Sequence, residues 1–179
     1  DDVLSFGLSW EDRRAASAGG FDESVDVRSV YVHNAWSPAA RLHLTAGLRH
    51  DDHSRFGGET TWRLGVSLRP GAGRTRLHAT VGTGFKAPTL NDLFFPFFNN
   101  PDLAPETSRG LDLGVERAFL GGRLSVDLTW FDTRFDDLIA FDFTTFAPQN
   151  IAEAASSGLE ATVRYRPGPA FQLAASHTW

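Results

Sequence analysis

The feature that most constrains this chain is a two-residue alternation of apolar and polar side chains that recurs along its whole length. In the clearest segment, about 41–50, every second residue is apolar: Leu42, Leu44, Ala46 and Leu48. Comparable segments lie near 3–11, 25–36, 62–69, 76–81, 111–116, 124–130, 159–165 and 171–179. Because successive side chains of a strand point to opposite faces of a sheet, the pattern predicts an all-β chain of about nine strands.

The lengths of the connections alternate along the chain. Long polar connections are expected at Arg13–Asp22, Asp51–Glu59, Phe85–Ser108 and Asp136–Pro148. Tight turns are expected at Ser37–Ala39, Pro70–Gly73, Leu120–Gly122 and Pro167–Pro169. This sorting predicts an antiparallel up-and-down meander with one elaborated rim and one plain rim, as in transmembrane β-barrels. A sandwich with Greek-key crossovers has no reason to sort its connections in this way.

One face of the predicted sheet is apolar, and the other face carries the charges. Arg49, Arg63, Asp112, Glu116 and Asp127 all fall on the polar side of the alternation. A small soluble barrel would turn these charges to water, whereas a membrane barrel would turn its apolar face to lipid and its charges to a wet lumen. Alternation alone does not distinguish these two kinds of barrel. For segment 25–36 it does not decide which residues lie on the apolar face, because Val30 and Val32 compete with Val27 and Tyr31.

Segment length and aromatic placement favour the membrane barrel. Several predicted strands reach the 9–11 residues that cross a hydrocarbon core at a tilt. Aromatic residues stand near strand ends, as in interfacial girdles: Trp10, Trp36, Trp62, Trp130 and Tyr165. A charge on the lipid face would cost about 2–4 kcal/mol at the midplane, and the apolar side of the central strands contains none.

Composition excludes several other classes of protein. The chain has 17 Lys+Arg against 22 Asp+Glu, a formal charge of −5, and no basic cluster that would suggest a nucleic-acid interface. It has no cysteine, which rules out disulfides, thiolate metal sites and a cysteine nucleophile. No Ser or His lies in a motif typical of hydrolytic catalysis, so we do not expect an enzyme.

Four motifs together resemble the β-barrel of TonB-dependent outer-membrane receptors. They are Leu44–Asp51, Thr83–Leu90, Asn100–Ser108 and Gly158–Ala161, and they follow the family's order along the chain. Within the family, Phe85–Thr89 followed by Asn91–Leu93 is most similar to cobalamin receptors, although siderophore receptors share much of this pattern.

The resemblance implies a protein of the bacterial outer membrane that takes up a large, scarce nutrient, either cobalamin or a ferric siderophore. It also implies a 22-stranded barrel with a plugged lumen, driven through TonB. This sequence shows no plug domain and no TonB box, and nine is an odd number of strands. Residues 1–179 are therefore expected to be a fragment of the barrel wall. A passive porin, a barrel hydrolase and a soluble or designed β-sheet protein remain alternatives.

The resemblance also suggests where ligands would bind. The candidate ligand-binding residues of the longest connection are Phe94, Phe95, Phe97, Phe98, Asn99 and Asn100. Alternatively, the Phe residues form an interfacial aromatic belt or a core that packs the loop. This alternative is favoured over ligand binding, because aromatic residues are common at membrane interfaces.

No cofactor is expected in the chain itself, but the resemblance suggests Ca²⁺ as a companion of the ligand in the longer protein. Asp51 and Asp52 are the candidate metal ligands. Because Ca²⁺ takes six to eight oxygen ligands, two adjacent carboxylates are too few alone, and a solvated loop is the favoured interpretation.

Overall fold

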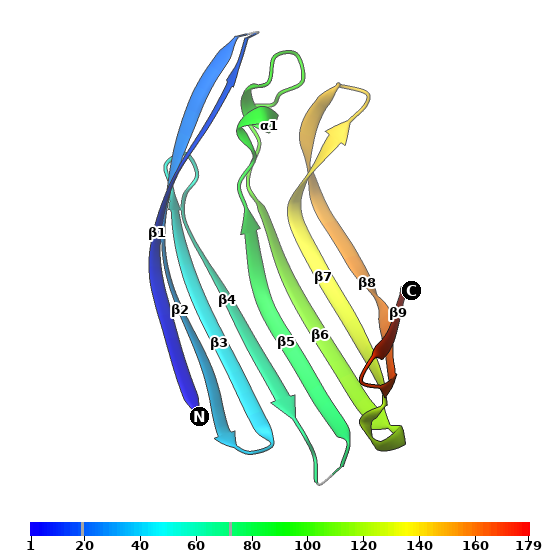
Figure 1. Ribbon diagram of the computed structural model, residues 1–179. Coiled ribbons are helices and arrows are strands. Elements are labelled where there is room, and N and C mark those ends of the chain that lie inside the picture. Colours follow the sequence, from blue (N-terminus) through cyan, green and yellow to red (C-terminus); the bar gives the residue numbers. More distant parts are fainter. Residues whose placement is uncertain (19, 72) are drawn as a thin grey trace.

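A computed structural model describes residues 1–18, 20–71 and 73–179, which form a single curved sheet (Figure 1). The sheet has nine strands in the order β1-β2-β3-β4-β5-β6-β7-β8-β9, and each pairs antiparallel with its neighbours in sequence. The predicted antiparallel meander is confirmed. The strands are β1 Asp2–Ser17, β2 Phe21–Ala39, β3 Leu42–His53, β4 Gly57–Leu68, β5 Thr75–Lys86, β6 Glu106–Phe119, β7 Leu124–Asp142, β8 Ala147–Gly168 and β9 Phe171–Thr178.

Two short helices lie in the connections. Helix α1 spans Leu90–Phe94 between β5 and β6, and the 3₁₀ helix η1 spans Leu120–Gly122 between β6 and β7. No helix of the described residues is long and apolar enough to cross a membrane.

Three of the four predicted long loops are wrong as loops, because the strands continue through them. Arg14 pairs with Ser24, Asp51 with Glu59, and Asp142 with Ala147, so each hairpin narrows to a few turn residues. Polar residues do not interrupt a strand when both faces meet water, since the backbone ladder satisfies its own donors and acceptors. Figure 1 shows these hairpins rising at the end of the sheet that also carries α1.

The short turns lie at the opposite end, and one of them is shifted. Ser37–Ala39, predicted as a tight turn, belongs to β2, and the register of the β2–β3 pair shifts between Trp36 and Ala39. The chain reverses at the next two residues instead. Of the predicted turn Pro70–Gly73, Ala72 lies outside the described residues, as does Gly19 of the first predicted loop.

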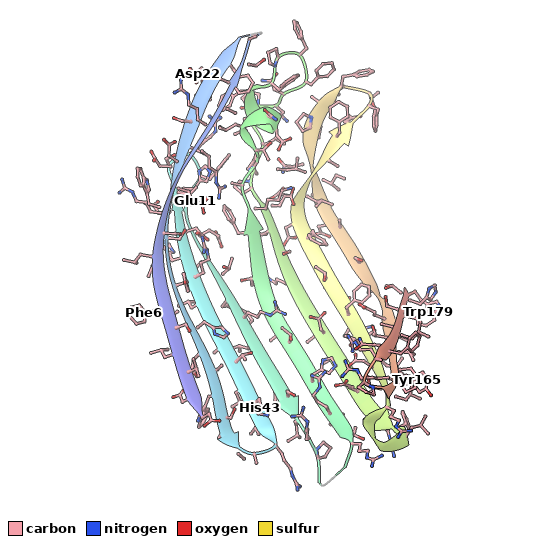
Figure 2. The ribbon with its side chains drawn as sticks, in the orientation of Figure 1. Phe6, Glu11, Asp22, His43, Tyr165 and Trp179 are labelled. Atoms are coloured by element: carbon pink, nitrogen blue, oxygen red, sulfur yellow. The ribbon has the colours of Figure 1, made fainter. Side chains whose placement is uncertain are left out.

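The apolar face of the sheet is uncovered, and its side chains do not converge on a closed centre. Leu64 is 49 % exposed and Leu8 82 % exposed. Figure 2 shows Phe6 projecting outward from β1. This is the arrangement expected of a sheet whose apolar face meets hydrocarbon.

The register also settles the two faces of β2. Val32 pairs with Phe6 on one side and Leu48 on the other, which places it on the apolar face. Tyr31 is on the polar face opposite Gly7, and a Cβ at position 7 would lie 2.6 Å from the Tyr31 ring. A glycine is therefore needed beneath this ring.

A ladder of paired polar groups crosses the polar face of β5, β6 and β7. Arg76 pairs with Glu116 and Glu116 with Asp127 in register, and Arg76 Nε donates to Glu116 Oε2 at 2.8 Å. His78 Nε2 and Asp127 Oδ2 are 3.1 Å apart, and Thr129 Oγ1 donates to Asp127 Oδ1 at 2.8 Å. These charges satisfy one another across strands, as a water-facing side of a barrel wall allows.

Candidate functional site: the rim of long connections

The connection between β5 and β6 is folded rather than loose. Thr89 caps helix α1: Asp92 N donates to Thr89 Oγ1 at 3.2 Å, and Thr89 N donates to Asp92 Oδ2 at 2.9 Å. This reciprocal pair is a capping box, which satisfies donors that a helix start otherwise leaves free. Such a cap allows a helix of one turn to persist at the exposed end of a sheet.

Helix α1 anchors the connection through a small apolar core. Leu93 is 1 % exposed, and Leu90 and Leu103 are also buried. Phe94 stacks on Phe21 of the β1–β2 hairpin, with ring centroids 6.4 Å apart, and the Arg55 guanidinium lies 5.0 Å from the centroid of the Phe94 ring. Phe94, predicted as a ligand residue, thus contacts residues of two neighbouring hairpins.

The two predicted asparagines bind backbone groups of the rim. Asn99 Nδ2 donates to Leu93 O at 3.0 Å. Asn100 Nδ2 donates to Pro148 O at 3.1 Å, and Asn100 Oδ1 accepts from Asp102 N at 3.0 Å. These contacts give both amides a part in shaping the connection.

Asn150 of β8 joins the β5–β6 connection to the β7–β8 hairpin. Its Oδ1 accepts from Ala104 N at 2.9 Å, and its Nδ2 donates to Ala104 O at 3.0 Å and to Asp137 O at 2.6 Å. One side chain therefore holds two segments that are 46 residues apart in sequence. Sequence reasoning missed Asn150, and no local signal marks it.

The remaining predicted phenylalanines are exposed above this base. Phe97 is 92 % exposed and has a φ of 73°, an uncommon conformation for a bulky residue, and Phe95 and Phe98 are about half exposed. The neighbouring hairpin adds Phe141, Phe143 and Phe146, of which Phe143 is 79 % exposed. We call these six residues the aromatic rim. The second trio was missed, although three phenylalanines within the six residues 141–146 of a predicted loop were its signal.

Asp142 fixes the tip that carries the second trio. Its Oδ1 accepts from Thr144 N and Thr144 Oγ1, both at 2.7 Å, and its Oδ2 accepts from Thr145 Oγ1 at 3.1 Å. Hydrogen bonds from Thr144 hold the pKa of the Asp142 carboxyl below its usual range. The aromatic rim therefore stands on two segments whose backbones are tied down.

His53 is a buried titratable group of this rim. It is 4 % exposed, its Nδ1 accepts from Arg55 N at 3.2 Å, and its ring lies 5.1 Å from the Phe56 ring. Asp52, the residue before His53, is exposed on the apolar side of β3. The apolar face of the sheet therefore ends before it reaches the level of His53. Burial lowers the pKa of His53, and the nearby charges of Arg13 and Arg55 lower it further.

The structure does not bring Asp51 and Asp52 together. They are consecutive residues of β3, so their side chains point to opposite faces. Asp51 is engaged by Arg49, with Nη2 and Oδ1 2.7 Å apart, and by the Ser29 hydroxyl. Among the described residues no group of three or more His, Asp or Glu side chains could hold a metal ion. The two carboxylates do not fit a shared Ca²⁺ site in this geometry.

Comparison with known proteins agrees with this architecture. The family model for the TonB dependent receptor-like β-barrel matches residues 2–179. The vitamin B12 transporter BtuB of Vibrio vulnificus is 36 % identical over 175 residues, which cover 93 % of this chain and 28 % of that protein. BtuB of Photobacterium profundum is 29 % identical, over 92 % of this chain and 28 % of that protein. The chain thus spans little more than a quarter of these relatives.

Solved structures show the same fold. The siderophore receptor PirA from Pseudomonas aeruginosa superposes with a TM-score of 0.83 at 24 % identity, over 99 % of this chain and 37 % of that one. The ferric enterobactin receptor PfeA superposes with a TM-score of 0.82 at 19 % identity, over 100 % of this chain and 33 % of that one. With the family model matching nearly every residue, this chain belongs to the TonB-dependent receptor β-barrel family.

Proposed function

We propose that this chain is a wall segment of an outer-membrane, TonB-dependent transporter that takes up cobalamin. The observation that carries the proposal is the aromatic rim, which stands on a hydrogen-bonded base. It lies at the end of the sheet that carries α1, which we call the long-connection end, and the apolar face of the sheet is uncovered. Long connections of such barrels face outside the cell. The named relatives with 36 % and 29 % identity are both vitamin B12 transporters.

The charge of the rim supports cobalamin over a ferric siderophore. The two segments that carry the aromatic rim, 87–108 and 135–163, contain no Lys or Arg of their own but do contain acidic residues, among them Asp92, Asp102, Asp137 and Asp142. Arg55 also reaches this connection, but its guanidinium is engaged by Pro101 O at 3.0 Å and by the Phe94 ring. A ferric tris-catecholate complex is an anion, and anion binding relies on Arg or Lys. A ligand without net negative charge, with broad surfaces for aromatic contact, suits this rim better.

The rest of the transport machinery is inferred from the family. A plug domain would occupy the lumen, where the ladder of Arg76, Glu116 and Asp127 gives it a polar wall to contact. TonB would supply the energy, and a Ca²⁺ ion accompanying the ligand would need oxygen ligands beyond Asp51 and Asp52. A passive porin would need neither a plug nor TonB, and catalysis has no support in the arrangement of these residues.

The test is cobalamin uptake by the complete protein in a bacterial strain that lacks its own cobalamin receptor. Uptake that stops when the proton gradient is collapsed is expected, whereas uptake that continues would indicate a porin. Phe97→Ser with Phe143→Ser should weaken cobalamin binding about tenfold or more, since loss of an aromatic anchor that the ligand covers costs about 2 kcal/mol or more. Phe171→Ser at the other end of the sheet is the matched control and should leave binding unchanged.

A further inference from the structure

The short turns at the other end of the sheet share an unusual charge. The four segments 39–42, 69–74, 117–124 and 164–171 contain no Asp or Glu. Each contains at least one arginine, and together they hold Arg41, Arg69, Arg74, Arg117, Arg123, Arg164 and Arg166. All seven arginines are exposed. We call this set the arginine rim.

The arginine rim has no internal counter-charge. In the part of the chain that the structure describes, none of its members forms an ion pair with a carboxylate, whereas Arg76, two residues beyond Arg74, is paired with Glu116. Backbone pairing also sets arginines side by side: Arg69 N donates to Arg41 O at 2.9 Å, and Arg166 N donates to Arg123 O at 2.6 Å. Neighbouring like charges across strands are unfavourable, so an external anion would relieve them.

Apolar side chains are exposed among these arginines at the β6–β7 turn. Phe119 is 40 % and Leu120 64 % exposed, and Leu120 has a φ of 50°. The Arg117 guanidinium lies 5.6 Å from the centroid of the Phe119 ring, and Tyr165 pairs with Leu124 across the same turn. Aromatic and arginine side chains together are typical of the boundary between hydrocarbon and lipid headgroups.

We infer that Arg117 and Arg123, with Phe119, Leu120 and Tyr165, form a binding site for the headgroup of an anionic phospholipid in the leaflet on the short-turn side. The site rests on the membrane location proposed above. Guanidinium groups pair with phosphate in bidentate geometry. The apolar residues continue the lipid-facing side of β6 and β8, so the same lipid's acyl chains lie against the wall of the barrel.

A lipid fits these residues better than an acidic peptide does. The arginines would recognise an acidic peptide by its charge alone. That recognition would leave Leu120 exposed and without a role. The partner must therefore combine a negative charge with hydrocarbon. Basic clusters at a membrane surface gain about a factor of five in affinity per Lys or Arg.

The test is lipid binding to the complete purified protein, measured by native mass spectrometry with phosphatidylglycerol and with phosphatidylcholine of the same acyl chains. The wild type should prefer phosphatidylglycerol, and the preference should fall as salt increases. Arg117→Gln with Arg123→Gln should weaken phosphatidylglycerol binding roughly 30-fold. The control, Arg28→Gln with Arg109→Gln, removes the same charge at the long-connection end and should change binding little.

Each outcome decides the inference. An equal loss in both double variants would show a general effect of charge and overturn the site, as would full displacement of the lipid by inorganic phosphate or a wild type without lipid preference. If the Arg117 and Arg123 variant does not fold, Arg123→Gln alone decides in its place, with a loss of roughly fivefold expected. Normal cobalamin uptake without lipid preference would refute only the lipid site, whereas lipid preference without uptake would support it and refute only the transport function.

Discussion

The two ends of this sheet are stabilised by different means. The long-connection end has its own core, in which Leu90, Leu93 and Leu103 are buried and Asn150 ties two segments together. The described residues of the short-turn end include no buried leucine; this end has exposed arginines and, at the β6–β7 turn, Gly121 with a φ of 72°. Side-chain packing therefore determines the shape of one end, and backbone geometry determines the shape of the other.

This difference matters for the ligand site proposed above. To bind a large ligand, the rim must hold several aromatic side chains at fixed positions. The buried leucines and the Asn150 contacts would provide that support. The described residues of the short turns pack no further connection against the sheet. In the proposed membrane location, these residues lie at the level of the lipid headgroups. Four predictions test this contrast, from the largest effect to the smallest.

Leu93→Ala should have the largest effect, because it empties the best-buried position of the long-connection end. A buried Leu→Ala change costs about 2–5 kcal/mol. The loss should appear as faster hydrogen exchange of the amides of 87–105, while amides of the short turns exchange as before. Leu128→Ala on the exposed apolar face is the control; an equal change in both variants would contradict a separate core.

Asn150→Ala should follow, since it leaves Ala104 N, Ala104 O and Asp137 O without their partner. These backbone groups are part-buried or exposed, and each lost hydrogen bond costs about 0.5–1.5 kcal/mol. The expected result is increased mobility of both the β5–β6 connection and the β7–β8 tip, measured by spin labels at Phe98 and Phe143. Gln149→Ala alters the adjacent residue and should leave both segments in place.

Gly121→Ala should cost about 1–2 kcal/mol at the short-turn end, because alanine is strained at positive φ. The measurement is the thermal midpoint of the complete protein in detergent. Gly168 has no positive φ and no atom within 4 Å of an added Cβ, so Gly168→Ala should be neutral. Equal midpoints for the two variants would mean that backbone geometry is not what determines this end.

Acidification should have the smallest effect, acting through His53. Its pKa in the folded protein is lowered by burial, so the unfolded chain takes up the proton first as pH falls. Stability of the long-connection end should decline as pH falls below about 6.5, the usual pKa of histidine. Hydrogen exchange of 87–105 against pH measures this, and His53→Gln should remove the dependence on pH in that range.

The sequence predicted the parts of the fold in which one face is apolar and the other polar. Segments such as 41–50 alternate clearly, and their register follows from that alternation. The stretch Arg13–Asp22 was mistaken for a loop because small and polar residues follow one another there without a period of two, so alternation carries no signal. The contacts of Asn150 were unpredictable for another reason: they join residues 46 positions apart through backbone groups, which leave no pattern in the sequence.

The strict neighbour-to-neighbour order of the nine strands has a consequence for how the chain is assembled. Every strand finds its partner within the adjacent stretch of polypeptide, so each hairpin can form before the next one is complete. No intermediate has to bring distant segments together, which keeps the search local and fast. Such a wall can be laid down one hairpin at a time, with each finished strand serving as the template for the one that follows.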